Sequence, residues 1–226
     1  MTAGAAITLL HVAAGTLVLV VAPAAIVVRK GGRWHRRWGA AFVYGMVAVL
    51  ATAAFMWQAN GHLFLLLLDV VCAYLVFQGL RVIARRRRRG AEPQADRIDL
   101  GAALAVLTAV AALLTVAFTA RGDLLRALAP ILIAIAAIAA AFAGLDLQAL
   151  RSRRQSRVGS LLVHLSAMIG AYVSAVTAFC VINLHHVSMS LRWVVPSVAG
   201  TLVISGFSAI VRHRGAQQAR RARTAD

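Results

Sequence analysis

Histidine is the only residue type in this chain that is both suited to binding haem or a transition metal and present in number. The seven histidines are His11, His35, His62, His164, His185, His186 and His213. The expected helix order places four of them toward one side of a membrane. We therefore take these four as candidate ligands of a metal ion: His11, His62, His185 and His186.

Asp69 is a carboxylate inside the apolar run that begins at His62. A carboxylate at the centre of a membrane helix costs roughly 2.5–3.5 kcal/mol on insertion scales, so Asp69 should face the interior of a bundle. His62 and Cys72 share its helical face, and His11 has a similar expected depth. We predict that His11 and Asp69 share a polar site with His62 at its mouth, an arrangement suited to proton-coupled transport or sensing.

His164 is the other histidine that we expect deep in the membrane, and it is a further candidate site residue. It lies in the opposite leaflet from His11, so these two side chains cannot bind one ion. Small residues accompany both histidines, Gly15 near His11 and Ala167 near His164. Two histidine levels beside small residues are typical of a di-haem membrane cytochrome, although small residues also mediate ordinary helix packing.

The composition identifies the class of protein that must hold these residues. Of the 226 residues, 61% are hydrophobic and only 14% are charged, whereas a soluble domain is nearer half apolar and a quarter charged. The net charge of +17 would suggest a nucleic-acid partner in a soluble protein. Here the arginines form short clusters between apolar runs, as in the loops of membrane proteins, so we expect no nucleic-acid partner.

Long apolar runs predict an all-α polytopic transmembrane bundle of seven helices in a single domain, 1–226. Each run supplies the roughly 20 residues that a bilayer core requires, and backbone groups in lipid must bond within a helix. We expect the helices near 5–28, 38–59, 62–84, 99–120, 124–149, 158–184 and 193–212. The basic tail, 213–226, is polar, and we expect it to fray.

The distribution of basic residues predicts the orientation. Four alternate inter-helix and terminal segments carry 21 of the Lys and Arg residues, and the opposite side carries three. By the positive-inside rule, the N-terminus lies outside and the C-terminus is cytoplasmic. We expect the arginine clusters to lie beside anionic lipid headgroups. The bias toward arginine and alanine is typical of a GC-rich bacterial genome.

Two short segments resemble one another, Phe77–Arg81 and Phe142–Asp146, and both lie at the cytoplasmic ends of expected helices. They place Arg81 and Asp146 at similar depth. An unpaired carboxylate is disfavoured there. We predict that Asp146 forms an ion pair with Arg81, or else with the arginines of the adjacent loop.

Three segments together resemble a family of bacterial membrane proteins known only as a domain of unknown function. They are His11 with Gly15, the loop Lys30-Gly-Gly-Arg-Trp-His-Arg-Arg-Trp-Gly39, and the segment His164–Phe179 followed by Trp193–Pro196 and Gly200. The resemblance covers most of the chain. It implies a small polytopic inner-membrane protein and supplies no reaction.

The chain contains no phosphate-binding loop, no Ser-His-Asp arrangement in a usable context and no CxxC motif. We therefore expect an integral membrane protein without enzymatic activity. Two functions stay open: proton-coupled transport or sensing at the polar site, and a membrane redox protein, like a cytochrome b, that binds haem or a transition metal. A visible spectrum and a metal analysis would distinguish them.

Overall fold

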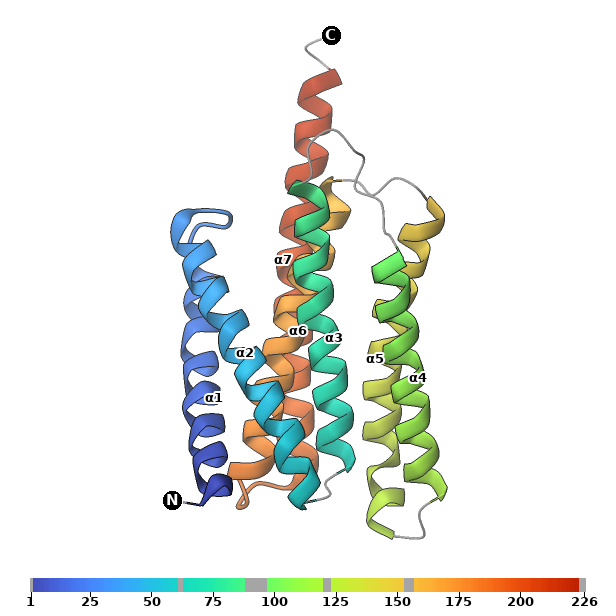
Figure 1. Ribbon diagram of the computed structural model, residues 1–226. Coiled ribbons are helices and arrows are strands. Elements are labelled where there is room, and N and C mark those ends of the chain that lie inside the picture. The colour runs from blue at the N-terminus through green and yellow to red at the C-terminus, as the bar shows by residue number, and fades with distance from the viewer. Residues whose placement is uncertain (1, 61–62, 88–96, 120–122, 153–156, 224–226) are drawn as a thin grey trace.

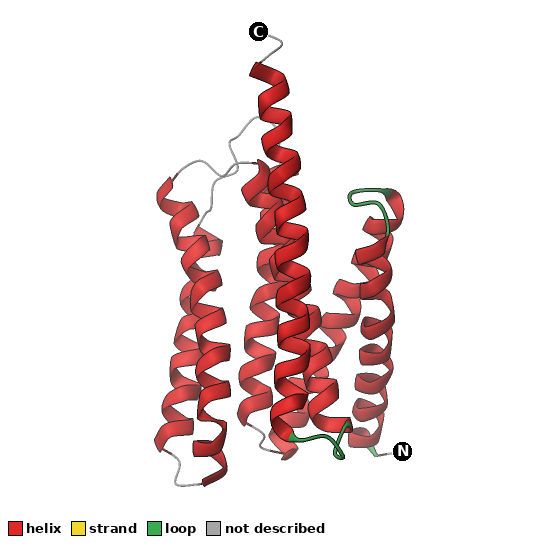
Figure 2. Ribbon diagram, turned by 180° about the vertical axis from the view of Figure 1, so that it is seen from behind, coloured by secondary structure: helices red, strands yellow, loops and turns green. Residues whose placement is uncertain are grey.

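The computed structural model describes residues 2–60, 63–87, 97–119, 123–152 and 157–223, and these residues form seven helices and no strand (Figures 1 and 2). The helices are α1 Ala3–Val27, α2 Arg33–Asn60, α3 Leu63–Arg87, α4 Arg97–Thr119, α5 Asp123–Ser152, α6 Arg157–Asn183 and α7 Met189–Arg223. Each helix contains a stretch that is long and apolar enough to cross a bilayer. The predicted all-α transmembrane bundle is confirmed.

Two helices extend well beyond their expected bounds. α2 begins at Arg33, directly after a tight turn in which Gly31 has a φ of 76°. Its first turns therefore contain arginines, whose long side chains can reach the polar edge of a membrane from within a helix. α7 continues to Arg223, through the tail that we expected to fray (Figure 1). Alanine, glutamine and arginine, which dominate this tail, favour helix.

α3 is the central helix of the bundle. It packs against α2, α4, α5 and α6, whereas α1 packs on α2 and α6, and α7 packs on α6. The hairpins α1–α2 and α4–α5 lie on either side of α3, α6 and α7 (Figure 1). In the membrane-spanning stretch of α3, 56% of the residues are buried, and this share does not exceed 28% in any other described helix. Polar side chains on α3 therefore face protein more often than lipid.

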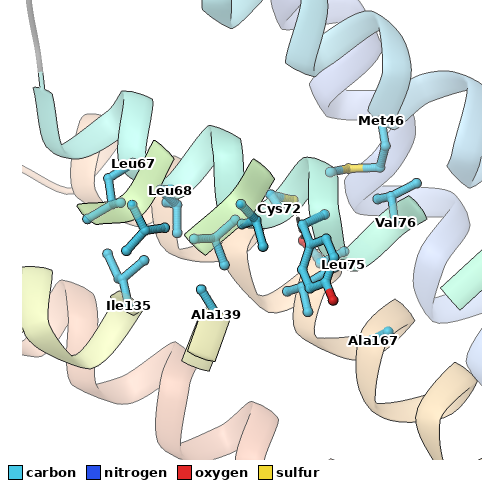
Figure 3. Packing of buried hydrophobic residues seen from close by; sticks show 14 of the residues in the cluster. Met46, Leu67, Leu68, Cys72, Leu75, Val76, Ile135, Ala139 and Ala167 are labelled. Atoms are coloured by element: carbon cyan, nitrogen blue, oxygen red, sulfur yellow. Dashed lines mark hydrogen bonds between the residues drawn. The ribbon is translucent and has the colours of Figure 1, made fainter. Parts of the chain in front are cut away.

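The core surrounds α3 and includes buried side chains from α1, α2, α4, α5 and α6. Leu67, Leu75 and Ala139 are almost completely buried, and Figure 3 shows Leu67 and Leu68 of α3 beside Ile135 of α5. Large apolar side chains on the outer helices stay exposed instead, between 61% and 76% for Leu9, Val20, Tyr44, Phe55 and Leu202. In water such a surface would cause aggregation, but lipid tails are as apolar as these side chains.

Candidate functional site

His35 of α2 and His164 of α6 meet at the arginine-rich end of the bundle. Their ring centroids lie 6.5 Å apart, with ring planes at 79°. Nδ1 of His35 donates to the carbonyl oxygen of Ala25 at 3.0 Å, and Nδ1 of His164 donates to that of Gly79 at 2.8 Å. These bonds fix the proton on Nδ1 of each ring. Neither Nε2 atom has a hydrogen-bond partner within the described ranges.

The end of α1 explains the position of His35. The last carbonyl groups of a helix have no donor within that helix. Ala25 is two residues before the end of α1, and its carbonyl accepts hydrogen bonds from His35 and also from Lys30. The turn at Gly31 reverses the chain so that both side chains can reach this carbonyl. His35 thus joins the start of α2 to the end of α1.

Gly79 explains the position of His164. A Cβ atom at Gly79 would lie 2.3 Å from Cε of Met168, so α3 and α6 approach more closely here than a larger residue would allow. His164 and Met168 are four residues apart on α6, and both contact Gly79. A thioether and an imidazole therefore lie on the same face of α6, one helical turn apart.

The two residues of the predicted outer site have different neighbours. Nδ1 of His11 lies 2.8 Å from Oγ1 of Thr52 on α2. In the described part of the chain, α1 packs mainly on α2 and α6, not on α3. Asp69 is half-buried and has no side-chain hydrogen bond or ion pair with a described residue. The structure thus joins His11 to Thr52 and not to Asp69, because α2 supplies a nearer hydroxyl.

The remaining candidate ligands are His62, His185 and His186. His62 lies outside the described residues. His185 and His186 are exposed in the turn between α6 and α7. Among the residues that the structure describes, no three His, Cys, Asp or Glu side chains are close enough together to hold a metal ion.

A buried charge network joins α3 to α4 and α5. Nε of Arg81 lies 3.0 Å from Oδ1 of Asp99, and Nη1 of Arg85 lies 2.7 Å from Oδ2 of the same carboxylate. Nη2 of Arg85 is 3.6 Å from Oδ1 of Asp146, whose Oδ2 accepts a 2.8 Å hydrogen bond from the Tyr74 hydroxyl. The side chains of Arg85 and Asp99 are only 3% and 1% exposed.

This network corrects one predicted pair and supports its alternative. Arg81 pairs with Asp99, and Asp146 pairs with Arg85, which belongs to the arginine run that we had considered as the other partner. The correction has a simple cause. Asp99 lies in the first turn of α4, which packs on α3, and its carboxylate reaches between Arg81 and Arg85.

Sequence reasoning overlooked two of these residues. The sequence places His35 in the loop before the helix that is expected to start at 38, on the same side of the membrane as His164. Asp99 stands at the start of the helix expected near 99–120 and is not among the candidate site residues. A search for acidic residues near the arginine-rich end of the helix that contains Arg81 would have found it.

Comparisons of the chain with protein-family models, curated proteins and solved structures find no match. The functional argument therefore depends on geometry and chemistry. The two features with defined chemistry are the histidine pair and the charge network. The network consists of ion pairs between buried charges that are already neutralised by one another, and such pairs hold helices together. The histidine pair instead presents two nitrogen atoms without protein partners, and such atoms can bind a metal ion or a proton.

Proposed function

We propose that this multi-pass membrane protein binds one copper ion through Nε2 of His35 and Nε2 of His164, with the thioether of Met168 as a third ligand. The observation that carries the proposal is that a hydrogen bond fixes the orientation and the tautomer of both rings. Each Nδ1–H is held by a backbone carbonyl, which leaves the lone pair of Nε2 available. Metal-binding histidines are commonly oriented by such a bond from their other nitrogen.

The separation of the two rings suits a shared ion. A bond between a metal and an imidazole nitrogen is about 2.0 Å long, so two rings facing each other across one ion have centroids roughly 6 Å apart. The observed value is 6.5 Å. The centroid separation therefore leaves room for one ion between the two imidazoles.

The donor set favours copper over other ions. Imidazole binds zinc, copper, iron and nickel, and a thioether selects copper in its singly charged state. Hard ions such as Mg²⁺ and Ca²⁺ require several oxygen ligands, and no carboxylate contacts either ring among the described residues. Lys30, whose amine shares the Ala25 carbonyl with His35, is cationic, and it repels a singly charged ion less than a divalent ion.

Haem was the other cofactor that the sequence suggested. Two axial histidines would have to lie on opposite faces of a macrocycle, which needs a wide space between the rings. Neither the cavity at the α1–α7 edge nor the one beside Cys180 lies between these rings. A Soret band in the absorption spectrum distinguishes haem from a bare ion at His35 and His164.

The test is a titration of the purified, metal-free protein with Cu(I) against a competing chelator. We expect one copper ion per chain, and we expect His35→Gln and His164→Gln to weaken binding by about 100-fold or more. Met168→Leu keeps the side-chain volume and should weaken binding less. His11→Gln is the matched control, since His11 is bonded to Thr52 and should leave the affinity unchanged.

Two results would overturn the copper site. One is wild-type affinity in the His35→Gln and His164→Gln proteins, with both eluting as folded monodisperse species. The other is a Soret band in the purified wild-type protein that both substitutions remove, since that would assign haem to these ligands.

Proton-coupled transport or sensing is the second candidate function. It has one specific observation in its favour, the half-buried carboxylate of Asp69 without a partner among the described residues. A carboxylate in that position is where a proton or cation would bind. Because His11 bonds to Thr52, this second proposal depends on the carboxylate of Asp69 alone.

We further propose that the protein lies in a bacterial inner membrane, as the resemblance to the uncharacterised family implies, with anionic lipid beside its arginine clusters. The 21-to-3 distribution of basic residues supports a cytoplasmic C-terminus. A reporter that is active only in the cytoplasm should therefore work when fused after Asp226 and fail when fused before Met1. The opposite pattern would reverse the orientation.

A further inference from the structure

A cavity of about 480 Å³ opens at the arginine-rich edge of the bundle, between the end of α1 and α7. In the described part of the chain, α1 does not pack extensively on α7, and Figure 2 shows these two helices apart. The cavity is lined by Ile26 and Val28 from α1 and its end, by Arg29 and Lys30, and by Phe207 and Arg214 from α7. Its wall is thus apolar on one part and cationic on another.

The cationic and apolar parts lie at different depths. Phe207 and Arg214 are seven residues apart on one face of α7, which separates them by about 10 Å along the axis. Phe207 is the deeper of the two, since α7 continues beyond Arg214 to its basic end. The amine of Lys30 lies 5.0 Å from the centroid of the Phe207 ring, a cation–π contact at the boundary between the two parts.

The apolar part continues along the helices toward the middle of the membrane. Val20 and Val27 lie on one face of α1 and are 66% and 86% exposed, and Val203 of α7 is 39% exposed one turn from Phe207. A ligand that fits must therefore present an anion to Arg29, Lys30 and Arg214 and a hydrocarbon chain to these valines. A phospholipid with an anionic headgroup has that shape.

We infer that this cavity is a specific binding site for an anionic phospholipid, whose phosphate contacts the three cations while one acyl chain lies between α1 and α7. The inference rests on the proposed contact between the arginine clusters and anionic lipid, and it locates that contact. It does not depend on the copper site. A soluble anion fits less well, because half of the lining would contribute nothing to its binding.

The experiment is a titration of the detergent-solubilised protein with phosphatidylglycerol. The melting temperature of the protein is measured at each lipid concentration. Arg29→Gln/Arg214→Gln removes two cations from the cavity and leaves Lys30, which caps α1, in place. Arg37→Gln/Arg212→Gln is the matched control, since it removes two charges from the same side of the protein, outside the cavity lining. Phosphatidylcholine and inorganic phosphate are titrated in parallel.

We expect phosphatidylglycerol to raise the melting temperature of the wild type and of the control, and its apparent affinity to fall roughly tenfold or more in Arg29→Gln/Arg214→Gln. An equal loss in the control would reduce the effect to general surface charge and overturn the site while keeping the proposed lipid contact. No stabilisation of the wild type would overturn both. Equal stabilisation by phosphatidylcholine or by inorganic phosphate would overturn the recognition of an anionic lipid.

Discussion

Asp99→Asn is expected to lower the free energy of unfolding by about 3–5 kcal/mol, the usual cost of breaking a buried ion pair by removing one partner. Asp99 lies between Arg81 and Arg85, at 3.0 Å and 2.7 Å. Asparagine has nearly the same shape but no charge. The substitution therefore leaves the guanidinium of Arg85, which is 3% exposed, with only its longer contact to Asp146.

Unfolding of the purified protein in mixed micelles measures this loss. Asp146→Asn is the matched comparison, because Asp146 is also buried but has a 3.6 Å ion pair and a hydrogen bond from Tyr74. We expect it to destabilise the fold less than Asp99→Asn does. Arg81→Gln should cost less in the Asp99→Asn background than in the wild type, because its main partner is already neutral. Equal effects of the two aspartate substitutions, or full additivity with Arg81→Gln, would contradict the role of Asp99 as the centre of the network.

Gly200→Ala is expected to destabilise the contact between α6 and α7 by about 1–3 kcal/mol, a typical cost of overpacking. A Cβ atom at Gly200 would lie 2.2 Å from Cγ2 of Val173 and 3.0 Å from its Cγ1. Valine is branched at Cβ and has few alternative rotamers in a helix, so it cannot turn away. α7 packs on the rest of the bundle through α6, and the two helices would have to separate.

The second substitution Val173→Ala should restore most of the stability lost by Gly200→Ala, since it removes both methyl groups that collide. Gly206→Ala on the same helix is the control, because nothing lies within 4 Å of its added Cβ atom. We expect it to be neutral or slightly stabilising, as alanine favours helix over glycine. If the double variant is as unstable as Gly200→Ala alone, the close approach of α6 and α7 at this point is wrong.

Local features of the sequence were sufficient to predict the helices of this protein. The length of each apolar run and the charges that bound it depend on neighbouring residues only, and a run of that kind in lipid has to be helical. The bounds were less certain, because charge was taken as the end of a helix at Trp38 and at His213. Arginine is compatible with the helical backbone, so α2 and α7 continue through their basic ends.

The partners of the polar side chains depended on how each helix is rotated in the bundle. Hydropathy predicts rotation poorly in a membrane, because side chains that face lipid and side chains that face the core are equally apolar. Asp146 was predicted to meet a cation at the right depth, but its partner is Arg85 rather than Arg81. His11 meets Thr52, and His35 meets His164, because close helix contacts such as Gly79 with Met168 set the rotation. The sequence by itself therefore determined which segments cross the membrane, and tertiary packing alone decided which of their polar groups lie together.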